Sequence, residues 1–281
     1  MKDFIDREIK ILDKGFVRVV DVMGEDSSIV QAARVSYASG TKTINEDRGL
    51  IRFLMRHKHT TPFEMCEIKL HIKCPIFVAR QWLRHRTANV NEMSARYSTI
   101  EDDFFVPSEE DLSTQSAMNK QGRQGSCDIS EIDCKSIVEK ISSVSQNSFD
   151  EYNIMLNEYN LTRELARIVL PQNAYTQFYW KIDLHNLLHF LRLRAHKKAQ
   201  KEIRDYAFAI LEIVKQWVPL TYEAFDDYIA NSVNFSKQEA GLITKIINQE
   251  ELQKMIDSSQ NDVLGKTEFI EFIEKLKKLK Q

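Results

Sequence analysis

The stretch richest in groups able to do chemistry is residues 84–97. Guanidinium groups can grip phosphate or carboxylate oxygens bidentately, and Glu92 can accept hydrogen bonds from ribose hydroxyls. If the second half of the window is extended, Glu92, Ser94 and Arg96 share one face. We therefore predict a site for a phosphorylated, nucleotide-like ligand rather than a solvated, salt-bridged helix end, which is the usual setting of a charge run. The side chains of the window that could contact such a ligand include Arg84, His85, Arg86, Asn89, Asn91, Glu92, Ser94 and Arg96.

A strand and a helix precede this window and must position it. Residues 66–74 alternate strictly between apolar and polar side chains, which predicts a half-buried strand of an antiparallel sheet. Pro75 then suits the first turn of a helix over residues 76–85. That helix would deliver Gln81 and Arg84 toward one pocket.

Further strands and helices are predicted on both sides of the window. Loose alternation predicts one or two strands over 8–23, and aromatic–polar alternation predicts another over 173–182. Asp183 is positioned to cap the helix that follows the latter strand. Glu202, near the start of the last helix of this region, is expected on the surface. The predicted helices are 26–37, 46–58, 131–159, 163–169, 184–195 and 198–217, with a short strand at 103–107 and an exposed loop at 108–130.

Composition limits the classes of protein to which the chain can belong. Its 281 residues are 43% hydrophobic and 28% charged, as in ordinary globular domains, and the net charge of −2 gives no global basic field for nucleic acid. No run approaches membrane-spanning length and the N-terminus lacks an apolar signal core, so we expect a cytoplasmic protein. The four cysteines form no CxxC pair, which predicts neither a zinc site nor a disulfide framework. No GxGxxG or GxxxxGK[ST] motif indicates a Rossmann or P-loop site.

The central window also carries a family resemblance. Arg84-His85-Arg86, seven residues, then Ser94 resembles the Arg-His-Arg-x7-Ser signature of the flavin-dependent thymidylate synthases. The likeness continues through residues 59–64 and 164–171 and fades near residue 230. It implies an α+β fold, with a mostly antiparallel sheet flanked by helices. The implied organisation is a catalytic domain over 1–230 and a helical C-terminal extension over 231–281.

The resemblance further implies which residues bind the cofactor and the substrate. FAD would contact Ser36, His59, Thr61, Glu64, Arg84, His85, Arg86, Asn91, Glu92, Asp183, His185 and His189. The nucleotide dUMP would contact Gln81, Arg84, Glu92, Met93, Ser94, Ala95, Arg96, Arg167 and Arg194. The family often has Asn-Ala-Arg where this chain has Asp183-Leu184-His185, which changes the contact expected at position 185.

The implied reaction is the reductive methylation of dUMP to dTMP in a homotetramer that shares its sites between subunits. Methylenetetrahydrofolate would donate the carbon, FAD would be the redox cofactor and NADPH the reductant. Arg194 would be the catalytic residue, stabilising the charge that develops near N3 and O2 of the uracil. An arginine is a poor general base, because its pKa lies above about 12. The resemblance implies no cysteine nucleophile.

Two other classes of function stay open from the residues alone. The basic window, with Trp82 and Tyr97 for base stacking, could belong to a module that binds RNA or single-stranded nucleic acid. Alternatively, a metal hydrolase could use histidines as ligands, although no third ligand at a definable spacing is evident. The histidines concerned are His57, His59, His185 and His189.

Overall fold

The computed structural model describes residues 3–35, 44–115, 123, 129–257 and 263–280. The chain divides into two compact units, Met1–Asn231 and Ser232–Gln281. The first unit contains the whole central window and all of the predicted site residues. One of these residues, Ser36, lies outside the described part of the chain.

The first unit is built on a five-stranded sheet in the order β1-β2-β3-β5-β4, in which every neighbouring pair is antiparallel. The central pair runs in full register, with Glu67 opposite Asp183 at one end and Pro75 opposite Tyr175 at the other. The predicted α+β class with a mostly antiparallel sheet is therefore confirmed. The strands are β1 Glu8–Ile11, β2 Gly15–Met23, β3 Glu67–Pro75, β4 Asn89–Glu92 and β5 Tyr175–Asp183.

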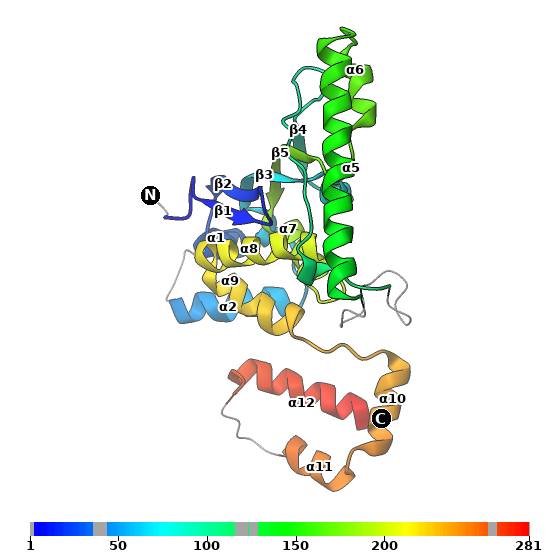
Figure 1. The fold of residues 1–281 in the computed structure, drawn as a ribbon. Coiled ribbons are helices and arrows are strands. Elements are labelled where there is room, and N and C mark those ends of the chain that lie inside the picture. Colours follow the sequence, from blue (N-terminus) through cyan, green and yellow to red (C-terminus); the bar gives the residue numbers. More distant parts are fainter. Residues whose placement is uncertain (1–2, 36–43, 116–122, 124–128, 258–262, 281) are drawn as a thin grey trace. The chain divides into compact units, whose positions relative to one another are not determined.

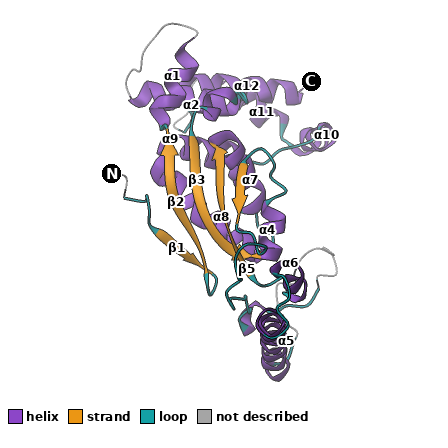
Figure 2. Ribbon diagram, turned by 90° about the horizontal axis from the view of Figure 1, so that it is seen from above, coloured by secondary structure: helices purple, strands orange, loops and turns teal. Residues whose placement is uncertain are grey.

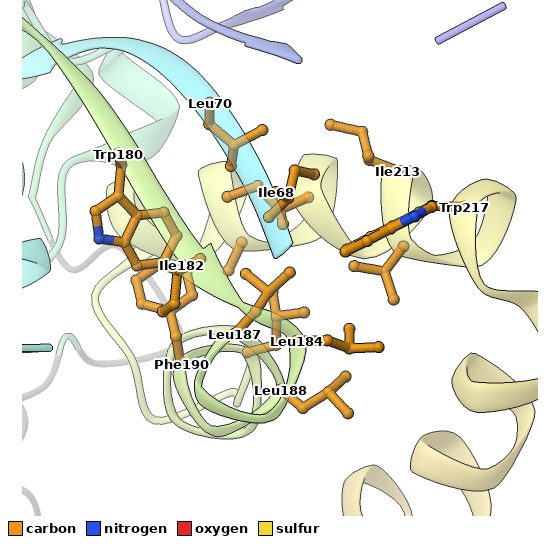
Figure 3. Close-up of a cluster of buried hydrophobic side chains, with 14 of the residues drawn as sticks. Ile68, Leu70, Trp180, Ile182, Leu184, Leu187, Leu188, Phe190, Ile213 and Trp217 are labelled. Carbon is orange, nitrogen blue, oxygen red and sulfur yellow. The ribbon is translucent and has the colours of Figure 1, made fainter. Parts of the chain in front are cut away.

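Three helices, α4 Ile76–Trp82, α7 Leu184–Arg194 and α8 Lys201–Trp217, pack against this sheet (Figure 2). The alternation predicted for β3 is confirmed, because every second side chain of β3 and β5 is buried beneath these helices. Figure 3 shows this core, to which β3, β5, α7 and α8 all contribute. Burying side chains of this size stabilises the fold by about 1.5–3 kcal/mol each. The core thus fixes the two helices that carry Gln81 and Arg194.

Four further helices complete this layer: α1 Asp26–Arg34, α2 Ile44–Arg56, α3 Thr61–Glu64 and α9 Pro219–Phe225, the last continuing into the π-helical turn η4 Asp226–Ala230. Asp26 connects α1 to α9, because its carboxylate accepts hydrogen bonds from the backbone N–H groups of Leu220 and Thr221 and from the Thr221 hydroxyl. Burial raises the pKa of Asp26, and these three donors oppose that rise.

A second, smaller core lies where the long helix α5 Glu131–Asn157 packs on α6 Arg163–Ala166 and η3 Arg167–Val169 (Figure 1). Phe149 and Tyr152 of α5 are fully buried there. Met93 and Ala95, from the central window, pack against the same cluster. The window is therefore supported from one side by the sheet and from the other by α5.

Several predictions about local structure were wrong in instructive ways. The extended conformation predicted after residue 91 ends with β4, and Ser94 instead begins a turn in which its carbonyl accepts from the N–H groups of Tyr97 and Ser98. Residues 103–107 form no strand, only a bridge between Phe104 and Ala174. Glu202 is buried, at 2% exposure, because the Arg123 guanidinium reaches it from a distant segment.

The second unit consists of three helices, α10 Lys237–Ile246, α11 Gln249–Asp257 and α12 Lys266–Lys280. Helix α10 begins with a capping box between Ser236 and Glu239. Among the described residues of this unit, the buried apolar side chains are Leu252 of α11 and Phe269 and Ile273 of α12. The division into a catalytic domain and a C-terminal extension stays a prediction, as does the exposed loop over 108–130. Among the described residues of the chain, no helix has both the length and the apolar character needed to cross a membrane.

Candidate functional site

The most tightly built part of the site lies where the end of α4 meets the end of α7. The Nε of Arg194 donates to Nε2 of His85 over 3.0 Å, and its Nη2 donates to the Gln81 carbonyl over 3.1 Å. Phe190, one turn before Arg194, places its ring 4.9 Å from the His85 ring in an edge-on arrangement. The structure therefore brings together three residues that the sequence assigned to FAD or dUMP, namely Gln81, His85 and Arg194.

Electrostatics at this junction favour a neutral histidine beside a charged arginine. Burial, followed by the positive charge of Arg194 and by His189, lowers the pKa of His85 from 6.5 to about 4. Burial, Arg192 and His185 likewise lower the pKa of His189. Burial also lowers the pKa of Arg194, but a guanidinium stays protonated at neutral pH. At pH 7 the junction therefore presents one fixed positive charge and uncharged imidazoles.

Two further cations flank this junction. Arg84 and Arg86 are exposed, and neither guanidinium forms an ion pair or hydrogen bond with any residue in the part of the chain that the structure describes. Their donors are thus available to an anionic ligand. The sequence predicted that Gln81 and Arg84 point toward one pocket. In the structure the Gln81 side chain instead donates to Gln200 over 2.5 Å.

A second group of site residues gathers in the turn after β4. The guanidinium of Arg96 lies 3.2 Å from the Glu164 carboxylate, and the Ser94 hydroxyl accepts from the Arg96 backbone N–H over 3.3 Å. Arg167 is anchored beside them, with Nε donating to the Glu164 carbonyl. Arg96 thus pairs with the Glu164 carboxylate, Arg167 bonds to the carbonyl of the same residue, and the Ser94 hydroxyl lies beside Arg96, so these groups are close enough to bind one phosphate.

Strand β4 joins this turn to the sheet. Glu92 is opposite Phe178 of β5, and its Oε1 accepts from the Thr176 hydroxyl over 2.7 Å. This bond orients the carboxylate while leaving its second oxygen open to a further donor. Asn91 is exposed on the same strand. Residues 89–92 therefore form an accessible edge between the turn and the rest of the sheet.

A third group lies at the start of α7 and on α3, two helices that contact each other. Asp183 caps α7, accepting from the backbone N–H of Asn186 over 2.9 Å and from its side chain over 2.7 Å. His59 and Thr61 are exposed, whereas Glu64 and His185 are half-buried. The carboxylate of Asp183 thus has a structural role in addition to any contact with a cofactor.

These three groups do not form one compact pocket within a single chain. His185 and Arg194 are nine residues apart on α7, which separates them by about 14 Å at 1.5 Å per residue. Glu92 and Asp183 are likewise about 17 Å apart, since Asp183 follows Phe178, the partner of Glu92, by five residues along β5. Ligands that touch all three groups must be long, as a dinucleotide is, or must be shared with another chain.

Sequence reasoning missed three residues that organise the site. Glu164, Thr176 and Gln200 hold Arg96, Glu92 and Gln81 respectively, from 68, 84 and 119 residues away in the chain. No local pattern marks such partners. Gln200 also lines a cavity of about 550 Å³ between α5 and the start of α8.

Metal binding was the other possibility for the histidines. Among the described residues, no group of three His, Cys, Asp or Glu side chains comes together in a way that could hold a metal ion. His57 and His59 instead pack around Phe53, with ring centroids 4.4 and 5.7 Å from it.

The chain is similar to known proteins over most of its length. The family described as thymidylate synthase complementing protein matches residues 18–220. A flavin-dependent thymidylate synthase from Ehrlichia ruminantium is 51% identical over 276 residues, which cover 98% of this chain and 90% of that protein. Its counterpart from Wolbachia pipientis is 52% identical over 271 residues, covering 96% and 93%. The crystal structure of the UMP/dUMP methylase PolB from Streptomyces cacaoi, bound with 5-Br dUMP, superimposes with a TM-score of 0.71 at 32% identity, covering 80% of this chain and all of that one.

Proposed function

This chain belongs to the flavin-dependent thymidylate synthases, and from that premise we propose that it methylates dUMP reductively to give dTMP. The observation that carries the proposal is the placement of Arg194. Its guanidinium is fixed by two hydrogen bonds, to the Gln81 carbonyl of α4 and to the neutral His85 that follows this helix. The proposed carbon donor is 5,10-methylenetetrahydrofolate, the redox cofactor is FAD and the reductant is NADPH.

The dUMP phosphate is proposed to bind in the turn after β4. Arg96 and Arg167 supply the positive charge, and the Ser94 hydroxyl and the adjacent backbone supply further donors. Glu92, with one oxygen already satisfied by Thr176, has the other free to accept from a ribose hydroxyl. Met93 and Ala95 pack on the α5 core and hold this turn in place. The nucleotide is thereby oriented by contacts remote from the atoms that react.

Arg194 is proposed to activate the uracil by electrostatics. C5 of a neutral uracil is a poor nucleophile, and loss or polarisation of the N3 proton raises its electron density. A guanidinium near N3 and O2 stabilises the negative charge that develops. Since Arg194 is half-buried, that stabilisation exceeds what the same charge would provide in water. Gln81 adds a polar contact at the same helix end.

The residues present fit a flavin dinucleotide. Arg84 and Arg86 offer guanidinium donors that no described residue occupies, which suits a diphosphate. The first turn of α7 and helix α3 contribute further polar groups. His185 in that turn lies about 14 Å from Arg194, a distance that an extended dinucleotide spans. When bound, FAD would supply the hydride that reduces the transferred carbon. The proposed FAD contacts are His59, Thr61, Glu64, Arg84, His85, Arg86, Asn91, Glu92, Asp183, His185 and His189.

A homotetramer with shared sites is part of the proposal. The separation of the three groups in one chain supports it, because another subunit could bring a complementary group close. Exposed apolar side chains beside the proposed phosphate site also support it, since Leu165 and Ile168 flank Arg167 and are 52% and 73% exposed.

The test is dTMP formation by the purified full chain, with dUMP, methylenetetrahydrofolate and NADPH, with and without added FAD. We expect product that depends on FAD. Absence of product from folded, flavin-loaded protein would reject the reaction. Failure to bind flavin, combined with salt-sensitive affinity for single-stranded RNA, would favour the nucleic-acid alternative for residues 84–97.

A further inference from the structure

We infer that His85 is a positioning residue for Arg194, holding the guanidinium through a neutral Nε2 acceptor and presenting its own Nδ1–H as a donor. The inference deepens the proposed function and rests on the role of Arg194 in it. It goes beyond a role for His85 as a cofactor ligand, because here the imidazole acts by holding the neighbouring Arg194 in place.

The geometry of Arg194 carries the inference. A guanidinium has five N–H donors. One is directed at His85 Nε2 and one at the Gln81 carbonyl, at 3.0 and 3.1 Å. The acceptors lie four residues apart, Gln81 in the last turn of α4 and His85 in the turn that follows Trp82, the last residue of α4, so together they fix the plane and the direction of the guanidinium. The three N–H groups that remain, one on Nη2 and two on Nη1, have no acceptor among the described residues.

The same bond fixes the state of the histidine. Nε2 can accept from Arg194 only when it carries no proton, so in the neutral ring the proton resides on Nδ1. The groups that face His85 from α7 are the guanidinium of Arg194 and the ring of His189, 6.1 Å away, and both oppose a positive charge on it. Phe190 packs edge-on to the ring and limits its rotation. A charged imidazolium would instead repel Arg194 and abolish the contact.

Two substitutions of His85 test whether its hydrogen bond to Arg194, rather than the bulk of its ring, is what matters. In His85→Phe the ring is kept without an acceptor, and in His85→Gln the side-chain carbonyl can accept from Arg194. We expect His85→Phe to lower kcat about tenfold or more, with KM for dUMP changed less than about threefold, because loss of a hydrogen bond to a charged group has effects of this size. Per bound flavin, His85→Gln should turn over faster than His85→Phe, because only the glutamine carbonyl can accept from Arg194. Flavin content is read from absorbance in all three proteins and kcat is expressed per bound flavin, because His85 is also a proposed FAD contact.

A double-mutant cycle tests whether the effect passes through Arg194. In an Arg194→Ala background, His85→Phe should produce little further loss, since the group that it positions is gone. A multiplicative loss in that background would overturn the inference. Per bound flavin, it would also be overturned if His85→Gln were as impaired as His85→Phe, or if His85→Phe matched the wild-type kcat.

A measurement without turnover keeps the inference apart from the proposed reaction. The ring ¹⁵N shifts of His85, assigned by comparison with His85→Gln, should show a protonated Nδ1 and an unprotonated Nε2 at pH 7. The opposite tautomer, or an imidazolium, would overturn the inference even in an active enzyme. If the expected tautomer is found but no dTMP is made, the contact stands and the reaction assigned to Arg194 fails.

Discussion

The Glu164 carboxylate lies 3.2 Å from the Arg96 guanidinium, at the place where the proposed function puts the phosphate of dUMP. Glu164 also receives Nε of Arg167 on its backbone carbonyl, so one residue holds both arginines. Both partners of the Arg96–Glu164 pair are about half exposed, at 49% and 57% of the side chain. Such a pair is weak, at about 0–1 kcal/mol, and can be displaced by a doubly charged phosphate.

Removing the charge of Glu164 should therefore tighten substrate binding. We expect Glu164→Gln to lower KM for dUMP about two- to fivefold, the equivalent of about 0.4–1 kcal/mol, while kcat stays unchanged. The matched control is Glu151→Gln, an equal change of charge at an exposed position of α5. A rise in KM for Glu164→Gln would mean that the carboxylate supports the substrate rather than competing with it.

Truncating the arginines should have an effect confined to phosphorylated substrates. We expect Arg96→Ala and Arg167→Ala each to raise KM for dUMP about 10- to 100-fold, because each removes charge-assisted hydrogen bonds. The comparison is with deoxyuridine, which lacks the phosphate. Its low kcat/KM should be nearly the same in the variants and in the wild type. Equal losses for both substrates would show that these arginines do not read the phosphate.

The parts of the fold that could be predicted are those written in local sequence. The alternation in residues 66–74 correctly indicated β3, and Asp183 correctly indicated the start of α7, because strand period and helix capping depend on near neighbours. The turn at Ser94 was missed, since polar residues with small neighbours suit either an extended chain or a turn. The site residues predicted by resemblance stay predictions.

Pairings across the chain could not be predicted. His85 and Arg194 are 109 residues apart, and their contact depends on how α4 and α7 cross over the sheet. Glu202 was expected at the surface, as an isolated glutamate usually is, and only the approach of Arg123 makes its burial tolerable. In each case the missing information is the tertiary arrangement that creates the partner.

Gly15 marks a close approach between the sheet and α8. A Cβ at this position would lie 1.9 Å from the Tyr206 hydroxyl, which donates to the Lys73 carbonyl, and 2.8 Å from two backbone oxygens. Gly15→Ala should therefore destabilise the protein by about 1–3 kcal/mol or more in urea unfolding. The control is Gly49→Ala in α2, where no atom lies within 4 Å of the added Cβ. That change should stabilise by about 0.5–1 kcal/mol, through helix propensity. Similar effects at both positions would contradict the packing argument.

The lowered pKa of His85 predicts a dependence of stability on pH. The folded protein binds a proton at His85 only near pH 4, whereas the unfolded chain binds it below about 6.5. The unfolded state thus holds more protons between these values, so the free energy of unfolding rises with pH across that window. Lowering the pH from 7 to 5 should shift the urea midpoint of the wild type more than that of His85→Gln. His71 and His189, whose pKa values are also lowered, contribute to both proteins and largely cancel. An equal or larger shift in the variant would contradict the assignment.

Asp183 provides the last prediction, which separates its structural role from its proposed contact with FAD. Both oxygens of its carboxylate are used at the start of α7, one by the Asn186 N–H and one by the Asn186 side chain. Asp183→Ala should cost about 1 kcal/mol of stability, as loss of a helix cap does, and lower Tm by about 2–4 °C. Asp183→Asn keeps an acceptor for the backbone N–H and should unfold close to the wild-type temperature. Because an amide keeps the cap but removes the charge, any loss of flavin affinity in Asp183→Asn reports on the cofactor alone. If Asp183→Asn is instead as unstable as Asp183→Ala, the charge of the carboxylate on the helix N-terminus, rather than its hydrogen bond, stabilises α7.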